Sequence, residues 1–258
     1  MNLRRPGGGQ TSRPTLAAMS NPSHGEFRAL PDAAPEDLKP LTLDLLKGAA
    51  REFARELTTR PVPALYGVTD GKAVGTFVEG AFNTYIAQRY RHDQGNAAKG
   101  IDFPSLDVDL KVTSIRQPQS SCPFRSATQK VYGLGYHLLV MVYEKEDDQA
   151  HSSSLLRVLH VIFIDEAFTA DFQTTKGIAD ILRRGGNADD MDAFLEERNL
   201  PLDEIGRRSL AERILVDPPR QGYLTISNAL QWRLQYGRAI ASANSPEAAG
   251  LEDLVAQQ

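Results

Sequence analysis

The chain has little cysteine and no long hydrophobic run. One cysteine, Cys122, among 258 residues excludes a disulfide framework and any zinc site built from cysteines. It stands in the sequence Ser-Ser-Cys-Pro, far from an obvious base, so we expect a buried, idle thiol. No apolar stretch approaches the roughly 20 residues needed to cross a bilayer, and the first residues lack the apolar segment of a secretory signal. These absences favour a protein that stays in a reducing cytoplasm and has no membrane partner.

Positive charge is also scarce. The formal net charge is −4, from 29 Lys and Arg against 33 Asp and Glu, which is not the balance expected of a nucleic-acid binder. Net charge averages over the whole surface, however, and a DNA-binding face needs only local Lys and Arg. Carboxylates gathered at a metal site would lower the total as well. The charge balance therefore argues mildly against DNA binding and does not exclude it.

The composition, 41% hydrophobic and 24% charged, is that of an ordinary globular protein with one sizeable core. Residues 1–38 are rich in Gly, Pro, Ser and Ala without periodicity, which predicts a disordered leader. We expect a single domain over residues 39–243, with its core at about 71–165 and a helical part at about 166–243. Residues 244–258 are predicted to be a frayed tail.

Hydrophobic periodicity predicts an α/β fold with a mixed central β-sheet flanked by helices. Residues 136–143 form a near-continuous apolar run, which is typical of a strand buried on both faces. Ser227 is the predicted N-cap of a last helix that carries Leu230, Leu234 and Ile240. The other predicted elements are helices at about 41–57, 71–90, 127–134, 174–184, 189–198 and 209–215, and strands at about 101–103, 106–114 and 154–165.

Charged residues alternate with apolar ones along the predicted strand at 106–114. Because alternate side chains of a strand share a face, Asp107, Asp109 and Lys111 should point one way, each roughly 7 Å from the next. Asp102 should return to the start of this strand. Mg²⁺ prefers a few oxygen ligands from the protein, and a neighbouring Lys can polarise the attacking water and offset phosphate charge. The segment thus has the parts for metal-assisted phosphodiester hydrolysis; an edge strand with a charged, solvated face is the alternative.

The predicted helix at 71–90 adds a carboxylate at or near its apolar side. Glu79 is surrounded in sequence by Phe77, Val78, Ala81 and Phe82, where a carboxylate is costly unless it is paired or bound to metal. Gly75 lies one turn earlier on the same face and would permit close packing against the helix. A boundary residue that reaches solvent is the alternative for Glu79.

The order Gly-x-x-x-Glu on a helix, then Asp-Phe-Pro, then acid-x-Lys seven residues after that Asp resembles the PD-(D/E)xK nuclease superfamily. It is similar more narrowly to the branch of the methyl-directed mismatch-repair nicking endonuclease and its restriction-enzyme relatives that cut GATC. The similar stretch covers residues 71–114. It rests on Lys72, Gly75, Glu79, Asp102, Phe103, Pro104, Leu106, Asp109, Leu110 and Lys111.

The resemblance implies a restriction-endonuclease-like core and a catalytic centre that binds one or two Mg²⁺ ions. Asp102, Asp109 and the backbone carbonyl of Leu110 would hold the metal. Lys111 would orient or activate the water, and Glu79 would hold a second metal or its water. The partners implied are double-stranded DNA, a second copy of the chain in a homodimer, and a cognate DNA methyltransferase.

The sequence departs from that branch at two positions. Asp109 stands where the branch usually carries Glu, which the superfamily allows. Asp107 stands where a small residue is expected, so a second register, with Asp107 as the ligand, stays open. The interval from Glu79 to Asp102 is also longer than in the nicking enzyme.

Two further segments are candidate DNA contacts, because Arg and Gln suit base edges and Ser suits phosphates. One is the loop after the acid-x-Lys strand, and the other lies near the end of the chain, in the helical part that we expect to contribute to recognition. A solvated loop, an ordinary polar helix face and a surface lysine are the alternatives. The candidates are Arg116, Gln117, Gln119, Ser120, Arg125, Lys130, Arg220, Gln231 and Arg233.

The sequence therefore predicts a type II restriction endonuclease that hydrolyses duplex DNA with Mg²⁺. A repair, nicking or junction-resolving nuclease would use the same chemistry. A DNA-binding protein with a decayed nuclease site is a third hypothesis, although all four catalytic candidates are present. An α/β protein unconnected with DNA is the fourth.

Overall fold

The structure is a computed structural model that describes residues 38–92, 100–123, 125–227, 232–245 and 247–255. The predicted leader lies outside these residues, except for its last position. None of the helices within these ranges is long and apolar enough to cross a membrane.

A mixed sheet forms the centre of the molecule, in the strand order β10-β7-β6-β4. Its strand β4 runs parallel to β6, whereas β7 runs antiparallel to both β6 and β10. The short β2 pairs with the first residues of β7, at Ser154 and Leu155. The bounds are β2 (Pro61–Val62), β4 (Val108–Ser114), β6 (His137–Asp148), β7 (Ser153–Ile164) and β10 (Leu251–Asp253). The predicted α/β class with a mixed central sheet is confirmed.

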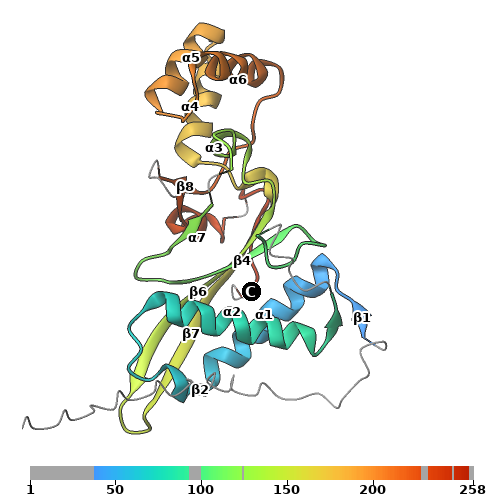
Figure 1. Ribbon diagram of the computed structural model, residues 1–258, viewed down its shortest axis with the longest axis vertical. Helices are drawn as coiled ribbons and strands as arrows, with labels where there is room; N and C mark the ends of the chain where they lie inside the picture. Colours follow the sequence, from blue (N-terminus) through green and yellow to red (C-terminus); the bar gives the residue numbers. More distant parts are fainter. Residues whose placement is uncertain (1–37, 93–99, 124, 228–231, 246, 256–258) are drawn as a thin grey trace, which may run out of the picture.

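Two helices cover one face of this sheet, as Figure 1 shows: α1 (Leu43–Thr59) and α2 (Gly71–Ala87). Thr42 caps α1 and Asp70 caps α2, each through its side-chain oxygen. Near them, β1 (Lys39–Pro40) pairs with β3 (Tyr90–Arg91), and the short 3₁₀ helix η2 spans Pro63–Leu65.

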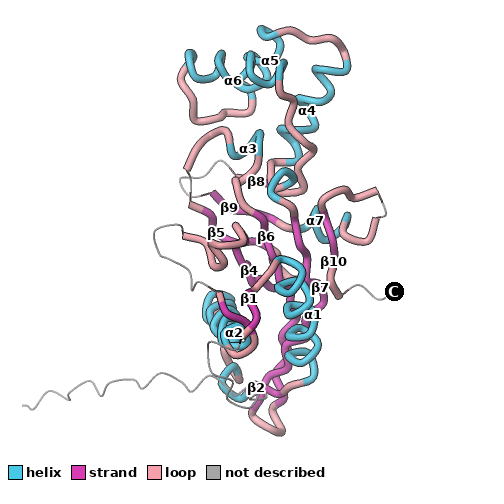
Figure 2. Tube along the Cα trace, turned by 90° about the vertical axis from the view of Figure 1, so that its right-hand side faces the viewer, coloured by secondary structure: helices cyan, strands magenta, loops and turns pink. Residues whose placement is uncertain are grey.

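A second, smaller sheet lies against the other face and is called the small sheet below. It consists of β5 (Gln119–Cys122), β9 (Trp232–Gln235) and β8 (Thr225–Ile226), in that order. The short α7 (Gly237–Ser242) follows β9. Figure 2 shows these strands between the central sheet and α3 (Gln129–Tyr132).

Strand β6 explains why both faces of the central sheet are covered. Its side chains alternate between two cores: Leu139 and Met141 pack with α1 and α2, while Leu138 and Val140 pack with the small sheet. Residues 138–143 of this strand are all apolar and buried, so the prediction of burial on both faces is confirmed for this stretch.

Helices gather at one end of the molecule, at the top of Figure 1. They share a third core cluster with residues of α3. Their N-caps are Asp171, Asn187 and Asp203. The bounds are η3 (Glu166–Phe168), α4 (Phe172–Arg183), α5 (Ala188–Glu197) and α6 (Glu204–Val216).

Two predictions for the end of the chain are wrong. The helix predicted after Ser227 is replaced by β9 and the short α7, because Trp232, Leu234 and Tyr236 alternate with polar residues and are buried along a strand-like stretch. The tail predicted to fray instead forms β10, which pairs with β7 and buries Leu251.

Candidate active site

A tight turn brings Asp102 to β4. Phe103 and Val108 form an antiparallel bridge, in which the Phe103 N–H donates to the Val108 carbonyl at 2.9 Å and the Val108 N–H donates back at 3.2 Å. The residue before the bridge therefore lies beside the residues after it. The Asp102 carboxylate accepts a hydrogen bond from the Leu110 backbone N–H at 2.9 Å. The structure thus returns this carboxylate to the start of the strand, as the sequence predicted.

Asp109 and Lys111 share one face of β4. Asp109 is 3% exposed, and its Oδ2 lies 2.8 Å from the Nζ of Lys111. The carboxyl groups of Asp102 and Asp109 are within hydrogen-bonding reach of each other. The opposite face of the strand carries Val108 and Leu110, which are fully buried under α2.

Asp107 does not belong to the predicted row. It precedes β4, lies in the turn after Phe103 and is exposed, with a backbone φ of +50°. In this left-handed conformation it reverses the chain direction rather than extending the strand, and Asp tolerates it better than most residues. The prediction that three charged side chains line one strand face is therefore corrected to two.

Glu79 comes from α2, one turn after Gly75. A Cβ atom at Gly75 would lie 3.6 Å from the Val112 carbonyl oxygen, so the helix runs close to the backbone of β4 at this point. Glu79 is half-buried and lies near enough to Asp102 and Lys111 for both charges to act on it. The structure thus brings all four catalytic candidates, from α2, the turn and β4, to one edge of the central sheet.

The site concentrates negative charge in a poorly solvated place. Burial raises the pKa of Glu79, and the charge of Asp102 raises it further. Burial likewise raises the pKa of Asp109. Burial would lower the pKa of Lys111, but the negative charges of Asp109, Asp102 and Glu79 outweigh it and leave the pKa raised. Lys111 is therefore held as an ammonium ion among carboxylates.

The donor set is compatible with a small hard cation at the edge of β4. Among the described residues, no group of three or more His, Cys, Asp or Glu side chains forms a ready-made metal site. Two carboxylates nevertheless converge, and a strand residue points its N–H and C=O to the same side. Because the Leu110 N–H reaches Asp102, the Leu110 carbonyl faces the same edge. Two carboxylates and a carbonyl leave room for water and phosphate around Mg²⁺.

The candidate DNA contacts have different positions. Arg116 and Gln117 are exposed in the turn after β4, while Gln119 and Ser120 lie in β5 and Arg233 lies in β9. The two segments, more than one hundred residues apart in sequence, are neighbours in the small sheet, where Ser121 pairs with Arg233.

The other candidates divide further. Arg125 and Arg220 are exposed, and the Arg125 guanidinium lies 5.7 Å from the ring centre of Tyr136. Lys130 is only 2% exposed, so its prediction as a surface lysine or phosphate contact is wrong. Its neighbours in space are distant in sequence and could not be predicted; one is Trp232, whose ring centre lies 5.8 Å from the Lys130 Nζ. Gln231 lies outside the described residues.

Two tyrosines and the cysteine form a buried layer beside Asp109. The sequence did not identify this layer as part of the site. The Cys122 thiol lies 3.4 Å from the Tyr136 hydroxyl, and the Ser120 hydroxyl lies 2.6 Å from that of Tyr236. Burial raises the pKa of both tyrosines, and the charge of Asp109 raises both further. The predicted burial of Cys122 is confirmed. The sequence signal for Tyr236 was the alternation of apolar and polar residues over 232–236, which is typical of a strand.

Comparisons with known proteins agree over most of the chain. A family model described as type II restriction enzyme NspV matches residues 40–253. The type II restriction enzyme NspV of Nostoc sp. is 55% identical over 213 residues, which is 83% of this chain and 94% of that enzyme. No solved structure gives a significant match. The matched range runs from β1 to β10 and contains the whole candidate site.

Proposed function

Because the chain belongs to the family of the type II restriction enzyme NspV, we propose that it cuts duplex DNA at a specific sequence by hydrolysing phosphodiester bonds with Mg²⁺. The restriction-enzyme family predicted from the sequence is thereby confirmed. The observation that carries the proposed active centre is the convergence of two carboxylates and one ammonium at the edge of β4, with a third carboxylate beside them. These are Glu79, Asp102, Asp109 and Lys111.

Asp102 and Asp109 are the proposed metal ligands, together with the backbone carbonyl of Leu110. Two carboxyl groups at hydrogen-bonding distance repel each other unless a proton or a cation lies with them, so the pair favours a bound cation. When bound, Mg²⁺ supplies positive charge that polarises the phosphate and promotes deprotonation of water. Glu79, on which the charges of Asp102 and Lys111 act, would hold a second ion or its water.

Lys111 is the proposed catalytic cation of the protein itself. Its ammonium group is held by Asp109, and its side chain is 20% exposed, so Lys111 is held in place without being sealed from solvent. There it can donate hydrogen bonds to a water and to a phosphate oxygen. Its stabilising effect is greatest where negative charge increases in the transition state.

The structure favours Asp109 over Asp107 as the acid of the acid-x-Lys pair. Asp109 is buried beside Lys111, whereas Asp107 lies exposed in the preceding turn. A carboxylate ligand held rigidly in a poorly solvated place binds a cation better than one in an exposed turn.

The finer features of the activity are part of the proposal. One chain contributes one active centre, so cutting both strands calls for two copies, and we expect a homodimer. A restriction enzyme endangers its own host DNA, so we expect a cognate methyltransferase in the same cells and a cytoplasmic location for both.

The test is digestion of a defined, unmethylated DNA by the purified protein with Mg²⁺ and with EDTA, followed by sequencing of the ends. The proposal predicts discrete double-strand ends that share one sequence, and none with EDTA. Single-strand nicks, or ends dependent on DNA structure, would indicate a repair or junction nuclease instead. Absence of cutting under any divalent metal would contradict the proposal.

A further inference from the structure

The small sheet has one apolar face and one polar face. Trp232 and Leu234 of β9 are buried, as are Cys122 of β5 and Ile226 of β8. The residues between them point the opposite way. This outward face pairs Ser121 with Arg233 and pairs Gln235 with both Gln119 and Thr225. Its side chains are exposed or half-buried.

The segments that build the small sheet are basic in an acidic protein. Residues 115–136 and 218–246 contain no Asp or Glu, although the whole chain has 33. They carry five arginines and one lysine. In the part of the chain that the structure describes, the Arg233 guanidinium has no ion-pair partner. Lys130 is buried, but all five arginines are exposed, so these segments carry an excess of positive surface charge, which is complementary to the phosphates of a duplex.

The small sheet is joined directly to the strand that carries the proposed catalytic residues. Thr113 lies on the same face of β4 as Asp109 and Lys111, and its hydroxyl oxygen accepts a hydrogen bond from the Gln119 N–H at 3.0 Å. Thr113 is four residues beyond Asp109, or about 13 Å at the rise of a strand. This length corresponds to about four base-pair steps of 3.4 Å each. The small sheet is therefore within a few base pairs of DNA held at the proposed active centre.

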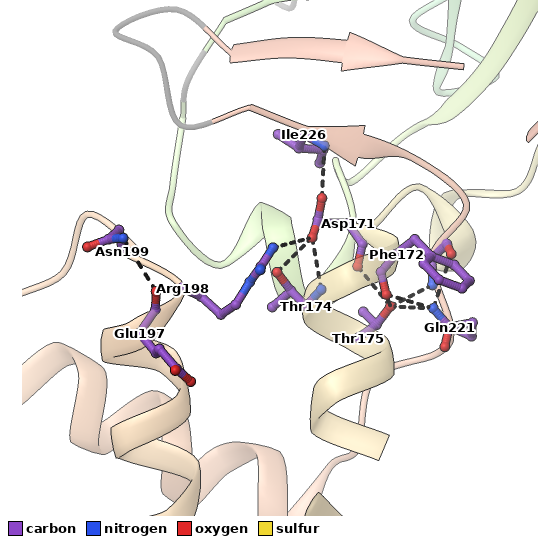
Figure 3. Close-up of polar contacts among 10 residues, drawn as sticks. Asp171, Phe172, Thr174, Thr175, Glu197, Arg198, Asn199, Gln221 and Ile226 are labelled. Carbon is purple, nitrogen blue, oxygen red and sulfur yellow. Dashed lines mark hydrogen bonds and ion pairs between the residues drawn. The ribbon is translucent and has the colours of Figure 1, made fainter. Parts of the chain in front are cut away.

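A buried polar cluster holds β8 in position, as Figure 3 shows. The Asp171 carboxylate accepts hydrogen bonds from the Ile226 N–H at 2.8 Å and from the N–H and hydroxyl of Thr174 at 2.9 and 2.7 Å. Arg198, the C-cap of α5, approaches the same carboxylate at 3.5 Å. Gly222 packs against Ala170 so closely that any side chain there would collide with its backbone. These contacts attach β8, and with it one edge of the small sheet, to the helical end.

We propose that the outward face of the small sheet enters the major groove and reads base edges, with Arg233 and Gln235 as specificity-determining residues. This inference rests on the proposed function. The major groove admits a ribbon of β-strands, and its edges present a distinct pattern for each base pair. Arg donates two hydrogen bonds to guanine, and Gln pairs with adenine through a donor and an acceptor. Lying two residues apart on one strand, both side chains reach the same groove.

The test compares cleavage of a library of duplexes with randomised sequence by four variants and the wild type, in Mg²⁺, with sequencing of the ends. The variants are Arg233→Ala, Arg233→Lys, Gln235→Ala and Arg157→Ala. Arg157 is the matched control, because it is also an exposed arginine on a strand. It lies in β7, outside the small sheet, and pairs with Glu144 of β6. Melting temperatures of all proteins establish that each one is folded.

We expect each alanine variant to cut the wild-type site roughly tenfold to a hundredfold more slowly, and to lose its preference at one base pair of each half-site. The position should be a guanine for Arg233 and an adenine for Gln235. Arg233→Lys should not restore the lost preference, because lysine keeps the charge but lacks the two-pronged donor. Arg157→Ala should keep both the rate and the preference of the wild type.

Two outcomes would overturn the inference while leaving the proposed function intact. One is an unchanged end sequence with unchanged rates in both alanine variants. The other is that Arg233→Ala cuts all sequences equally more slowly and Arg233→Lys restores the rate, since this result identifies a phosphate contact. If the wild-type protein leaves no defined ends, or if the Lys111→Met variant cuts as fast as the wild type, the proposed function fails and the inference fails with it.

Discussion

Replacing Lys111 by methionine separates a nuclease from a protein that only binds metal or DNA. Methionine keeps much of the stem's length and apolar bulk but removes the charge that lies 2.8 Å from Asp109. A unit charge centred about 4 Å from the ammonium, as on a phosphate group whose oxygen contacts it, interacts with it by about 4 kcal/mol at an effective dielectric constant near 20. If that charge develops mainly in the transition state, losing Lys111 slows cleavage on the order of a thousandfold, at 1.36 kcal/mol per decade.

The assay for Lys111→Met is single-turnover cleavage and equilibrium binding on one cognate duplex in Mg²⁺. Lys47→Met is a matched control: Lys47 is 22% exposed, against 20% for Lys111, and pairs with Glu252 at 3.0 Å away from the site. We expect the control to cut like the wild type, and Lys111→Met to bind DNA with little change. Cleavage by Lys111→Met within tenfold of the wild type would refute this reasoning.

Three further predictions follow from the same geometry. Glu79→Gln should slow single-turnover cleavage by at least about tenfold, or 1.4 kcal/mol, without weakening DNA binding; an unchanged rate would remove Glu79 from the active centre. Mg²⁺ should raise the melting temperature of the wild type but not of Asp109→Asn. Burial raises the pKa of Asp109, and a metal needs the ionised carboxylate. On acidification, Mg²⁺ binding should therefore weaken at a higher pH than it would with an ordinary Asp. Titration calorimetry across pH measures this, and Mg²⁺ binding that persists down to the usual pKa of Asp would contradict it. Asp171→Ala should lower the free energy of unfolding by about 3 kcal/mol, because it leaves the buried N–H groups of Thr174 and Ile226 without an acceptor. The exposed N-cap variant Asp203→Ala should cost only about 1 kcal/mol, and equal losses in chemical denaturation would show that the Asp171 cluster is not a special support.

The convergence of the candidate site residues could be predicted from the sequence because most of the arrangement is local. Asp102, Asp109 and Lys111 lie within ten residues of each other, and strand alternation sets which side chains share a face. The failure at Asp107 has a local cause as well, since its positive φ belongs to the turn that returns Asp102 to the strand. A period-two rule cannot detect where a strand begins.

The small sheet could not be predicted in the same way. Its strands β5 and β9 are four residues each and lie more than one hundred residues apart, and the partner of β9 that is nearby in sequence, β8, has only two residues. Leu230 and Leu234 are four residues apart, which also fits a helix, and only pairing with β5 decides the matter. Lys130 is similar: its burial depends on the fold around it, where Asp171 and Arg198, from distant segments, influence its pKa alongside the dominant effect of burial. Long-range packing overrides the local preference of each segment.

The measurement that tests the proposed active centre most directly compares Asp109→Asn with Asp107→Asn, its exposed neighbour two residues away. Each change removes one carboxylate charge with almost no change in shape. Both variants should bind the cognate duplex, and melting temperatures should show both to be folded. We predict that Asp109→Asn abolishes cleavage in Mg²⁺ while Asp107→Asn keeps substantial activity. The opposite result, with Asp107 essential and Asp109 dispensable, would contradict the active centre described here.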